Sequence, residues 1–193
     1  IGIDSTPSSI EACKNKGIEA VCSKLSEFKP SVGDSIDIVT MWHVLEHVSD
    51  PVDLINEVKS LLSIHGSLYF SVPLSPASYE TLEFDPLNLP PHHLTRWSIN
   101  SLRKLAETTE MSIEIYLPKA ESFLFRTLRS IVIITERSFS ENNKFIKLSN
   151  LLKLIGTNPL LVFKAFYLQS LREKYNKRVQ PDLVLVKLTK TGQ

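Results

Sequence analysis

One short segment of the chain carries three side chains that could bind a metal ion or move a proton. His43, Glu46 and His47 lie in the string HVLEH. On one helix, two imidazoles four residues apart can share a zinc ion while the glutamate acts as a base, which is the arrangement of the H-x-x-E-H zinc peptidases. No clear third ligand follows downstream. A zinc peptidase therefore stays a remote alternative, and no metal site is assigned.

A loop stiffened by two prolines offers further reactive groups in the string PPHHLTRWS. Imidazole is the side chain best suited to proton transfer near neutral pH, so His47, His92 and His93 could each accept a proton from a bound acceptor. Arg96 presents a planar donor fork that suits a carboxylate or phosphate group. We therefore predict catalytic roles for these three histidines and a substrate contact for Arg96, and we assign Trp97 to the core.

Asp4 stands where the ribose of a nucleotide could bind. It follows the short apolar run IGI, and open α/β sheets bind their ligands outside the carboxyl ends of the strands. A carboxylate there can accept hydrogen bonds from both ribose hydroxyls, but a strand-terminal aspartate caps a helix about as often. A glycine-rich turn normally precedes such an acidic residue by about 20 positions. We therefore expect that turn to lie upstream of Ile1.

The apolar pattern predicts the elements that must hold these residues. Strands are expected at 1–3, 18–22, 36–41, 67–72, 113–117 and 182–188, and helices at 6–17, 51–62 and 98–109. The run IDIVTM reads as a central strand buried on both faces, and Asp50-Pro51 as a helix start. Apolar residues recur at helical spacing within 122–178. Alternation of strands and helices predicts a doubly wound α/β domain.

The string DIVTMWHVLEHVSDPVDLINEVKSLLSIHGSLYFSVP, residues 37–73, closely resembles the stretch between the fourth and fifth strands of class I S-adenosylmethionine-dependent methyltransferases. These include ubiquinone-biosynthesis O-methyltransferases and bacterial glycan-modifying relatives, and LEHVSDP is the most diagnostic part. The resemblance implies a Rossmann-like seven-stranded fold whose first strand precedes residue 1. Residues 1–118 and 179–193 would form the core, and residues 119–178 would form a basic helical insertion before the last strand.

The same resemblance implies S-adenosylmethionine as the cofactor and assigns residues to it. The implied cofactor-binding residues all lie at or just after the ends of predicted strands: Asp4, Ser5, Lys24, Leu25, Met41 and Trp42. Asp4 would hold the ribose hydroxyls, and His43 would contact the acceptor. Some ubiquinone-type relatives bind a divalent cation at this cluster, but His43 replaces its first acidic residue.

The implied reaction is methyl transfer to an oxygen or nitrogen of a small-molecule, glycan or lipid-linked acceptor. A catalytically inactive fragment or binding module with the same fold is the alternative. Methyl transfer is a displacement at the methyl carbon, for which the protein must mainly align donor and acceptor and accept a proton.

Charge is distributed unevenly along the chain and bears on its partners. Residues 1–118 hold 16 Asp and Glu against 8 Lys and Arg, whereas residues 119–178 hold 4 against 12. Basic residues mixed with bulky apolar ones favour an anionic or membrane-associated acceptor over nucleic acid.

The two cysteines form no metal or disulfide pattern, and no apolar run is long enough to span a bilayer. We expect a cytoplasmic protein, and two interpretations of residues 122–178 stay open: peripheral contact with the inner face of the membrane, or apolar faces that pack on the sheet or form a dimer contact.

Overall fold

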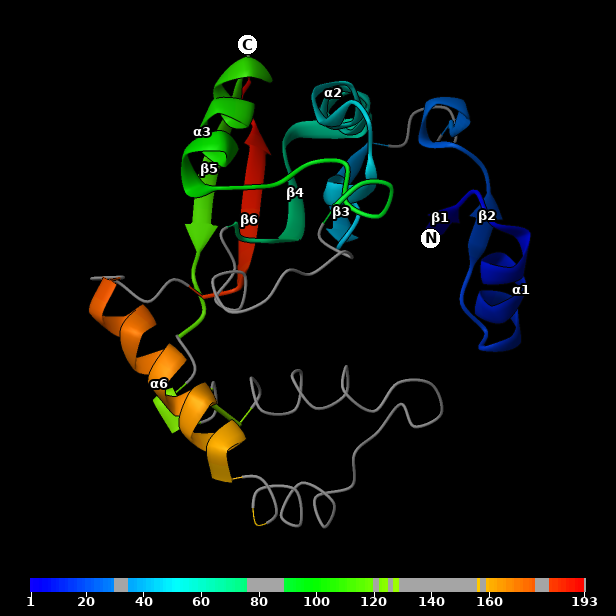
Figure 1. Cartoon of the computed structure of the whole chain (residues 1–193). Helices are drawn as coiled ribbons and strands as arrows, with labels where there is room; N and C mark the ends of the chain where they lie inside the picture. The colour runs from blue at the N-terminus through cyan, green and yellow to red at the C-terminus, as the bar shows by residue number, and fades with distance from the viewer. Residues whose placement is uncertain are drawn as a thin grey trace.

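The computed structural model in Figure 1 describes residues 1–29, 35–75, 89–119, 122–124, 127–128, 156, 159–175 and 181–192. In chain order the elements are β1 (Gly2–Asp4), α1 (Pro7–Asn15), β2 (Ala20–Cys22), the 3-10 helix η1 (Leu25–Glu27), β3 (Ile36–Trp42), the 3-10 helix η2 (Leu45–His47), α2 (Pro51–Leu61), β4 (Leu62–Pro73), α3 (Ile99–Thr108), β5 (Met111–Tyr116), α6 (Pro159–Tyr175) and β6 (Leu183–Lys190). The chain is a mixed α/β protein, as the alternation of patterns predicted.

The described strands form two sheets. A four-stranded sheet has the order β3-β4-β6-β5, in which β3 is parallel to β4 and β6 runs antiparallel to both of its neighbours. A separate two-stranded sheet pairs β1 with β2 in parallel, and Figure 1 places this small sheet and α1 to one side of β3. The sequence expectation that IDIVTM is buried on both faces is wrong here: Ile38, Thr40 and Trp42, which share one face of β3, are all exposed.

Helices α2 and α3 supply much of the core that packs against the larger sheet. Asp50 caps α2 by accepting a hydrogen bond from the Asp53 N–H at 2.9 Å, as its position before Pro51 predicted. Ser98 and Ser101 form a reciprocal capping box at the start of α3. The buried apolar side chains come from both layers and include Ile55, Val58, Leu102, Leu105, Leu68, Phe70, Val186 and Leu188.

His65 and Gly66, which separate the predicted helix at 51–62 from the predicted strand at 67–72, lie inside a strand. Helix α2 passes directly into β4 at Leu62, five residues earlier than the predicted strand start at Ser67. The chain bends within the strand: His65 has a φ of 66°, and the β3–β4 register shifts between Ile36 and Ile38. A Cβ added at Gly66 would stand 3.0 Å from the Ile36 carbonyl oxygen, so the close approach of β3 requires glycine at this bend.

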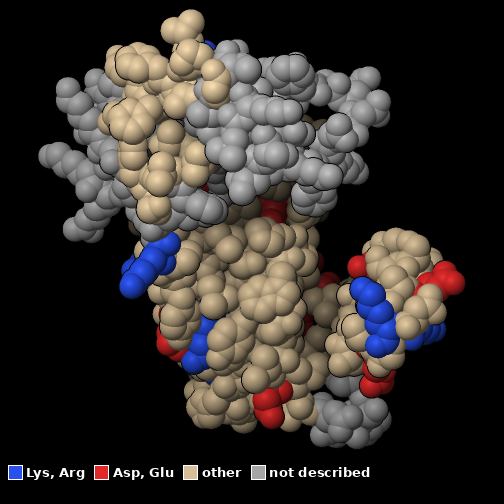
Figure 2. All heavy atoms as spheres, turned by 90° about the horizontal axis from the view of Figure 1, so that it is seen from below, with Lys and Arg blue, Asp and Glu red and all other residues tan. Residues whose placement is uncertain are grey.

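Part of the predicted helical region is confirmed by α6, although residues 129–155 lie outside the described part of the chain. Four large apolar side chains of α6 are exposed, namely Leu160, Phe163, Phe166 and Tyr167. Figure 2 shows largely uncharged surface at the upper left, where α6 lies. Among the described residues, no helix combines the length and the apolar character that crossing a bilayer requires.

Candidate functional site

The chain reverses direction sharply after β3, and this turn brings reactive side chains together. His43 has a φ of 54°, a conformation that is uncommon for residues other than glycine. Its backbone N–H donates to the Ser71 carbonyl oxygen at 3.1 Å, which holds the turn against β4. Backbone outliers of this kind concentrate at functional sites, because the surrounding structure must hold them in place.

His43 and Glu46 form a pair of imidazole and carboxylate. The Nδ1 of His43 lies 3.1 Å from Oε1 of Glu46. The glutamate side chain is 1% exposed, whereas the histidine side chain is 54% exposed. A carboxylate only accepts hydrogen bonds, so Nδ1 carries the hydrogen and Nε2 keeps its lone pair on the exposed side. A base oriented by a buried carboxylate is the arrangement that proton-transfer sites use.

The zinc-peptidase arrangement is not formed at these residues. The motif requires His43 and His47 one turn apart on an α-helix, but only Leu45–His47 is helical, as the single 3-10 turn η2. His43 precedes that turn in a left-handed conformation and bonds to Glu46 instead. The spacing H-x-x-E-H therefore brings together a different pair from the one that the peptidases use.

The loop after residue 88 is joined to η2 through the backbone. The carbonyl oxygen of Glu46 accepts hydrogen bonds from the N–H groups of Leu94 at 2.8 Å and Thr95 at 3.1 Å. The Nδ1 of His47 lies 2.6 Å from the carbonyl oxygen of His92. The rings of His47 and His93 meet edge to face, with centroids 4.9 Å apart. All three predicted catalytic histidines thus lie around η2.

The other residues predicted in this loop divide as expected between core and surface. Trp97 is buried, and its carbonyl oxygen accepts a hydrogen bond from the Ser75 N–H at 2.7 Å. Arg96 is exposed beside it, in a position compatible with the substrate contact predicted for it. Leu94, a candidate for the core in the sequence, is also exposed.

The residues predicted to bind the cofactor fall into two groups on different sheets. Asp4 is the last residue of β1, and Ser5 follows it. Lys24, just before η1, lies close to both, because the N–H of the preceding residue Ser23 donates to the Asp4 carbonyl oxygen at 3.1 Å. Leu25 is partly buried against the main core. Met41 and Trp42 end β3 on the larger sheet. No strand ladder joins β1 to β3 within the described residues.

These side chains fit a nucleoside cofactor in part. Asp4 is exposed at its strand end, but Oδ1 already accepts a hydrogen bond from the Thr6 N–H at 2.7 Å, which leaves the second oxygen for a ribose. The predicted cap of α1 is Thr6, but its side chain makes no capping bond. Met41 packs against the core, whereas Trp42 is 55% exposed and offers an apolar face beside His43. Trp42 is therefore a surface residue rather than part of the core.

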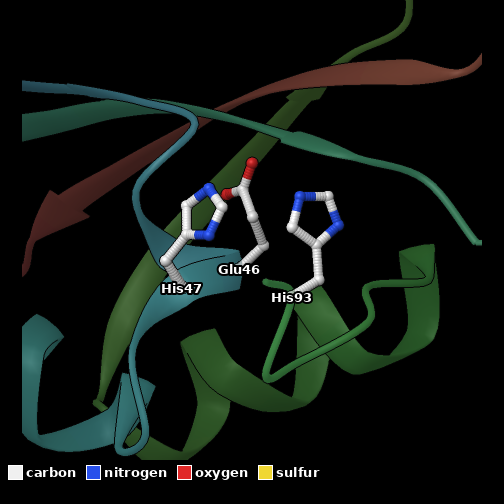
Figure 3. A group of neighbouring side chains, drawn as sticks. All are labelled: Glu46, His47 and His93. Atoms are coloured by element: carbon white, nitrogen blue, oxygen red, sulfur yellow. The ribbon is translucent and has the colours of Figure 1, made fainter. Parts of the chain in front are cut away.

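One functional residue escaped the sequence reasoning. Glu46 appeared there as part of a peptidase motif and of the cation-binding cluster of some relatives, without a role of its own, yet it is the buried carboxylate around which three histidines gather, two of which Figure 3 shows beside it. Its neighbour Leu45, in the same 3-10 turn, is also buried. The 3-10 turn makes this possible, and the sequence carries no clear signal for it.

Comparisons with known proteins agree on one family. The family profile described as "Methyltransferase domain" matches residues 2–113. Among solved structures, a SAM-dependent methyltransferase from Archaeoglobus fulgidus is 18% identical with a TM-score of 0.56, covering 98% of this chain and 75% of that one. A possible histamine N-methyltransferase from Thermotoga maritima is 12% identical with a TM-score of 0.57, covering 99% and 73%.

A plantazolicin methyltransferase, solved with a desmethylPZN analogue and SAH, is 16% identical with a TM-score of 0.55 and covers 99% of this chain and 67% of that one. No curated protein matches the chain. At these identities the solved structures bear on the fold, and they confirm the Rossmann-like α/β class that was expected from the sequence.

Proposed function

The chain belongs to the family of methyltransferase domains, and from this premise we propose that it transfers the methyl group of S-adenosylmethionine to an oxygen or nitrogen atom of an acceptor. The observation that carries the proposal is the His43–Glu46 pair at the end of β3, inside the matched residues 2–113. When bound, the cofactor supplies an electrophilic methyl carbon on a sulfonium. The chain must then align the acceptor and take up its proton.

We assign the proton to Nε2 of His43. The sequence favoured His47, His92 and His93 for this role, but the geometry favours the histidine that a buried carboxylate orients. Proton uptake makes His43 an imidazolium, and the hydrogen bond from its Nδ1–H to Oε1 of Glu46, 3.1 Å away, then becomes charge-assisted and stabilises the positive charge. Exposure of the His43 ring on the other side leaves room for a hydroxyl or amine to approach.

The residues of this chain that hold the cofactor are proposed to be Asp4 and Ser5 at the ribose, Lys24 and Leu25 near the adenine, and Met41 and Trp42 at the methionine end. Support comes from the exposed carboxylate of Asp4 and the exposed indole of Trp42, both at strand ends. Their assembly requires β1 and β3 to contribute to one site, which is the arrangement expected of an open α/β sheet.

The acceptor is proposed to be a small molecule, a glycan or a lipid-linked group. Two features support an anionic or lipid-linked acceptor: the exposed Arg96 near η2, and the exposed apolar side chains of α6 in a segment rich in Lys and Arg. The names of the similar solved structures mention different molecules, a desmethylPZN analogue and histamine, so support for the acceptor class comes from this chain's own surface.

His43→Asn tests the proton transfer with little disturbance of the backbone. Asparagine tolerates the left-handed conformation at a φ of 54°. His65→Asn is the matched control, since His65 is also exposed and has a φ of 66° but lies at the far end of β4. In the full-length protein, release of S-adenosylhomocysteine is measured with a phenol, a hexose and a primary amine as acceptors.

Loss of a general base lowers kcat by roughly 10²- to 10⁴-fold. We expect this loss for His43→Asn with unchanged affinity for S-adenosylhomocysteine, and no loss for His65→Asn. Equal rates for the two variants would remove His43 from the reaction. A protein that binds S-adenosylhomocysteine but methylates none of the three acceptor classes would instead support the binding-module alternative.

A further inference from the structure

Helix α6 presents its largest apolar side chains to solvent. Leu160, Phe163 and Tyr167 are 83%, 69% and 54% exposed. They recur three and four residues apart, the spacing that places side chains on one face of a helix. Ala165, which the helical period places on the opposite side, is fully buried. A surface helix normally turns its bulky apolar side chains toward the core, and α6 does the opposite.

The aromatic side chains of α6 form an ordered cluster on this surface. The rings of Phe163 and Tyr167 are stacked, with centroids 6.4 Å apart and planes 9° from parallel. Phe166 meets the ring of Phe123 edge to face at 5.0 Å, yet it is still 53% exposed. Exposed apolar side chains that cluster in this way mark a contact with another protein or with a membrane.

Charge distinguishes between the possible partners of this face. Lys164 is exposed and lies about one turn from both Leu160 and Tyr167. Residues 159–170 contain no Asp or Glu, and residues 119–178 hold 12 Lys and Arg against 4 Asp and Glu. A second copy docked here would bring two basic segments together, and like charges across an interface are unfavourable. An anionic lipid surface attracts the same residues.

We propose that α6 lies in the plane of an anionic phospholipid bilayer, with Leu160, Phe163 and Tyr167 inserted into it and Lys164 at the lipid phosphates. Helices that bind in this way bury their apolar face about 5–10 Å into the boundary between headgroups and acyl chains. The phenol of Tyr167 suits that boundary, because its ring is apolar and its hydroxyl is polar. The long stem of Lys164 allows its ammonium group to reach the headgroups.

The position of α6 relates this surface to the candidate site. β4 and β5 end at the same edge of the larger sheet, where Pro73 and Tyr116 pair with Leu183 and Leu185 of β6, and β3 is parallel to β4. Figure 1 shows α6 beyond this edge. The turn at His43 follows β3 at the same edge. A lipid-linked acceptor in the bilayer would thus be on the side of the sheet that carries the site. This link rests on the proposed methyl transfer, whereas the membrane contact does not.

Cosedimentation with vesicles tests the contact on the full-length protein, without cofactor or acceptor. One set of vesicles is an equimolar mixture of phosphatidylcholine and phosphatidylglycerol, and the other is phosphatidylcholine alone. Phe163→Gln/Tyr167→Gln removes apolar side chains and keeps good helix formers, and Lys164→Glu reverses the charge. The matched controls are Ile64→Thr, at an exposed apolar residue of β4, and Lys14→Glu, at an exposed lysine of α1.

We expect the wild type to bind the mixed vesicles at low salt and to bind phosphatidylcholine vesicles at least about tenfold more weakly. Phe163→Gln/Tyr167→Gln should weaken binding to the mixed vesicles roughly 10- to 100-fold, because two bulky side chains no longer leave water. Lys164→Glu should weaken it about fivefold or more. Both controls should bind as the wild type does.

Fluorescence provides a second measurement with a variant that keeps the aromatic ring. Tyr167→Trp places an indole on the α6 face, whereas the native Trp42 and Trp97 lie on β3 and just before α3. Brominated phospholipid in the mixed vesicles should quench this variant more strongly than the wild type. Equal quenching of the two proteins would contradict insertion of α6.

Three further results would overturn the proposal. Equal affinity for the two kinds of vesicle would exclude a role for lipid charge, and wild-type affinity in Phe163→Gln/Tyr167→Gln would exclude α6. A dimer in sedimentation velocity that this double variant abolishes, without any vesicle binding, would assign the face to a second copy. Thermal unfolding of each variant confirms that it is folded. Because no methyl transfer is measured, these outcomes leave the proposed function untouched.

Discussion

Asp4 gives the sharpest test of where the cofactor binds, because one of its two carboxylate oxygens already has a partner. Oδ1 accepts the Thr6 N–H at 2.7 Å. Asp4→Asn keeps a carbonyl oxygen for Thr6 and replaces the second oxygen with an amide donor, whereas Asp4→Ala removes both acceptors. A hydrogen bond to a charged group contributes about 1.5–3 kcal/mol, which corresponds to a roughly 10- to 150-fold change in Kd.

The assay is calorimetric titration of the full-length protein with S-adenosylhomocysteine, with thermal unfolding measured in parallel. Both variants should bind at least about tenfold more weakly. Only Asp4→Ala should also unfold earlier, since one lost backbone bond of about 1 kcal/mol lowers Tm by roughly 2–4 °C in a chain of this size. Glu11→Gln, an exposed carboxylate on α1, serves as the control. Wild-type affinity in Asp4→Asn would show that Asp4 only stabilises the start of α1.

Three further outcomes concern the scaffold. Asp50→Ala removes the acceptor of the Asp53 N–H and should lower the unfolding free energy by about 1 kcal/mol in urea denaturation. An unchanged urea midpoint would show that this capping bond does not stabilise α2. Ile55→Ala, at a fully buried position, should lower it by about 2–5 kcal/mol, and a loss below about 1 kcal/mol would mean that α2 packs loosely. A hydrogen bond from Lys187 lowers the pKa of the Glu114 carboxyl. Its stabilising contribution is therefore present above the pKa of a free glutamate and is lost as pH falls through the lowered value. The Tm difference between wild type and Glu114→Gln should shrink on acidification below the range of a free glutamate, and a difference that grows there refutes this.

Most of the fold was predictable because its local patterns agree with its tertiary structure. Asp50-Pro51 starts α2 and Ser98 starts α3, where short polar side chains satisfy backbone N–H groups whatever the rest of the chain does. The exposure of Ile38 was not predictable, since an apolar run shows that a strand can be buried but does not show which elements cover its faces. The sequence separated a helix at 51–62 from a strand at 67–72, but β4 begins at Leu62 and its pairing with β3 continues on both sides of the bend at His65.

The candidate site was predictable residue by residue but not as an arrangement. The histidines of the loop and of HVLEH were each singled out, because imidazole is a common proton acceptor and metal ligand in functional sites. Their meeting around Glu46 depends on a left-handed residue, one 3-10 turn and two backbone bonds from a loop more than forty positions away. None of these leaves a periodic signal in sequence, and therefore the burial of Glu46 could only be seen in the structure.

The position of β6 also determines the order in which the sheet can be built. Leu188 pairs with Leu68 of β4 on one side and Ile113 of β5 on the other, although both of those strands precede it by more than seventy residues. During synthesis β4 and β5 leave the ribosome with open edges, which are templates for wrong pairing. Closing so long a connection adds little to the equilibrium cost, about 0.6 kcal/mol for each doubling of its length, but such nonlocal pairing slows folding. The sheet is therefore completed in a late, slow step, and the period before it is when the chain is most exposed to aggregation.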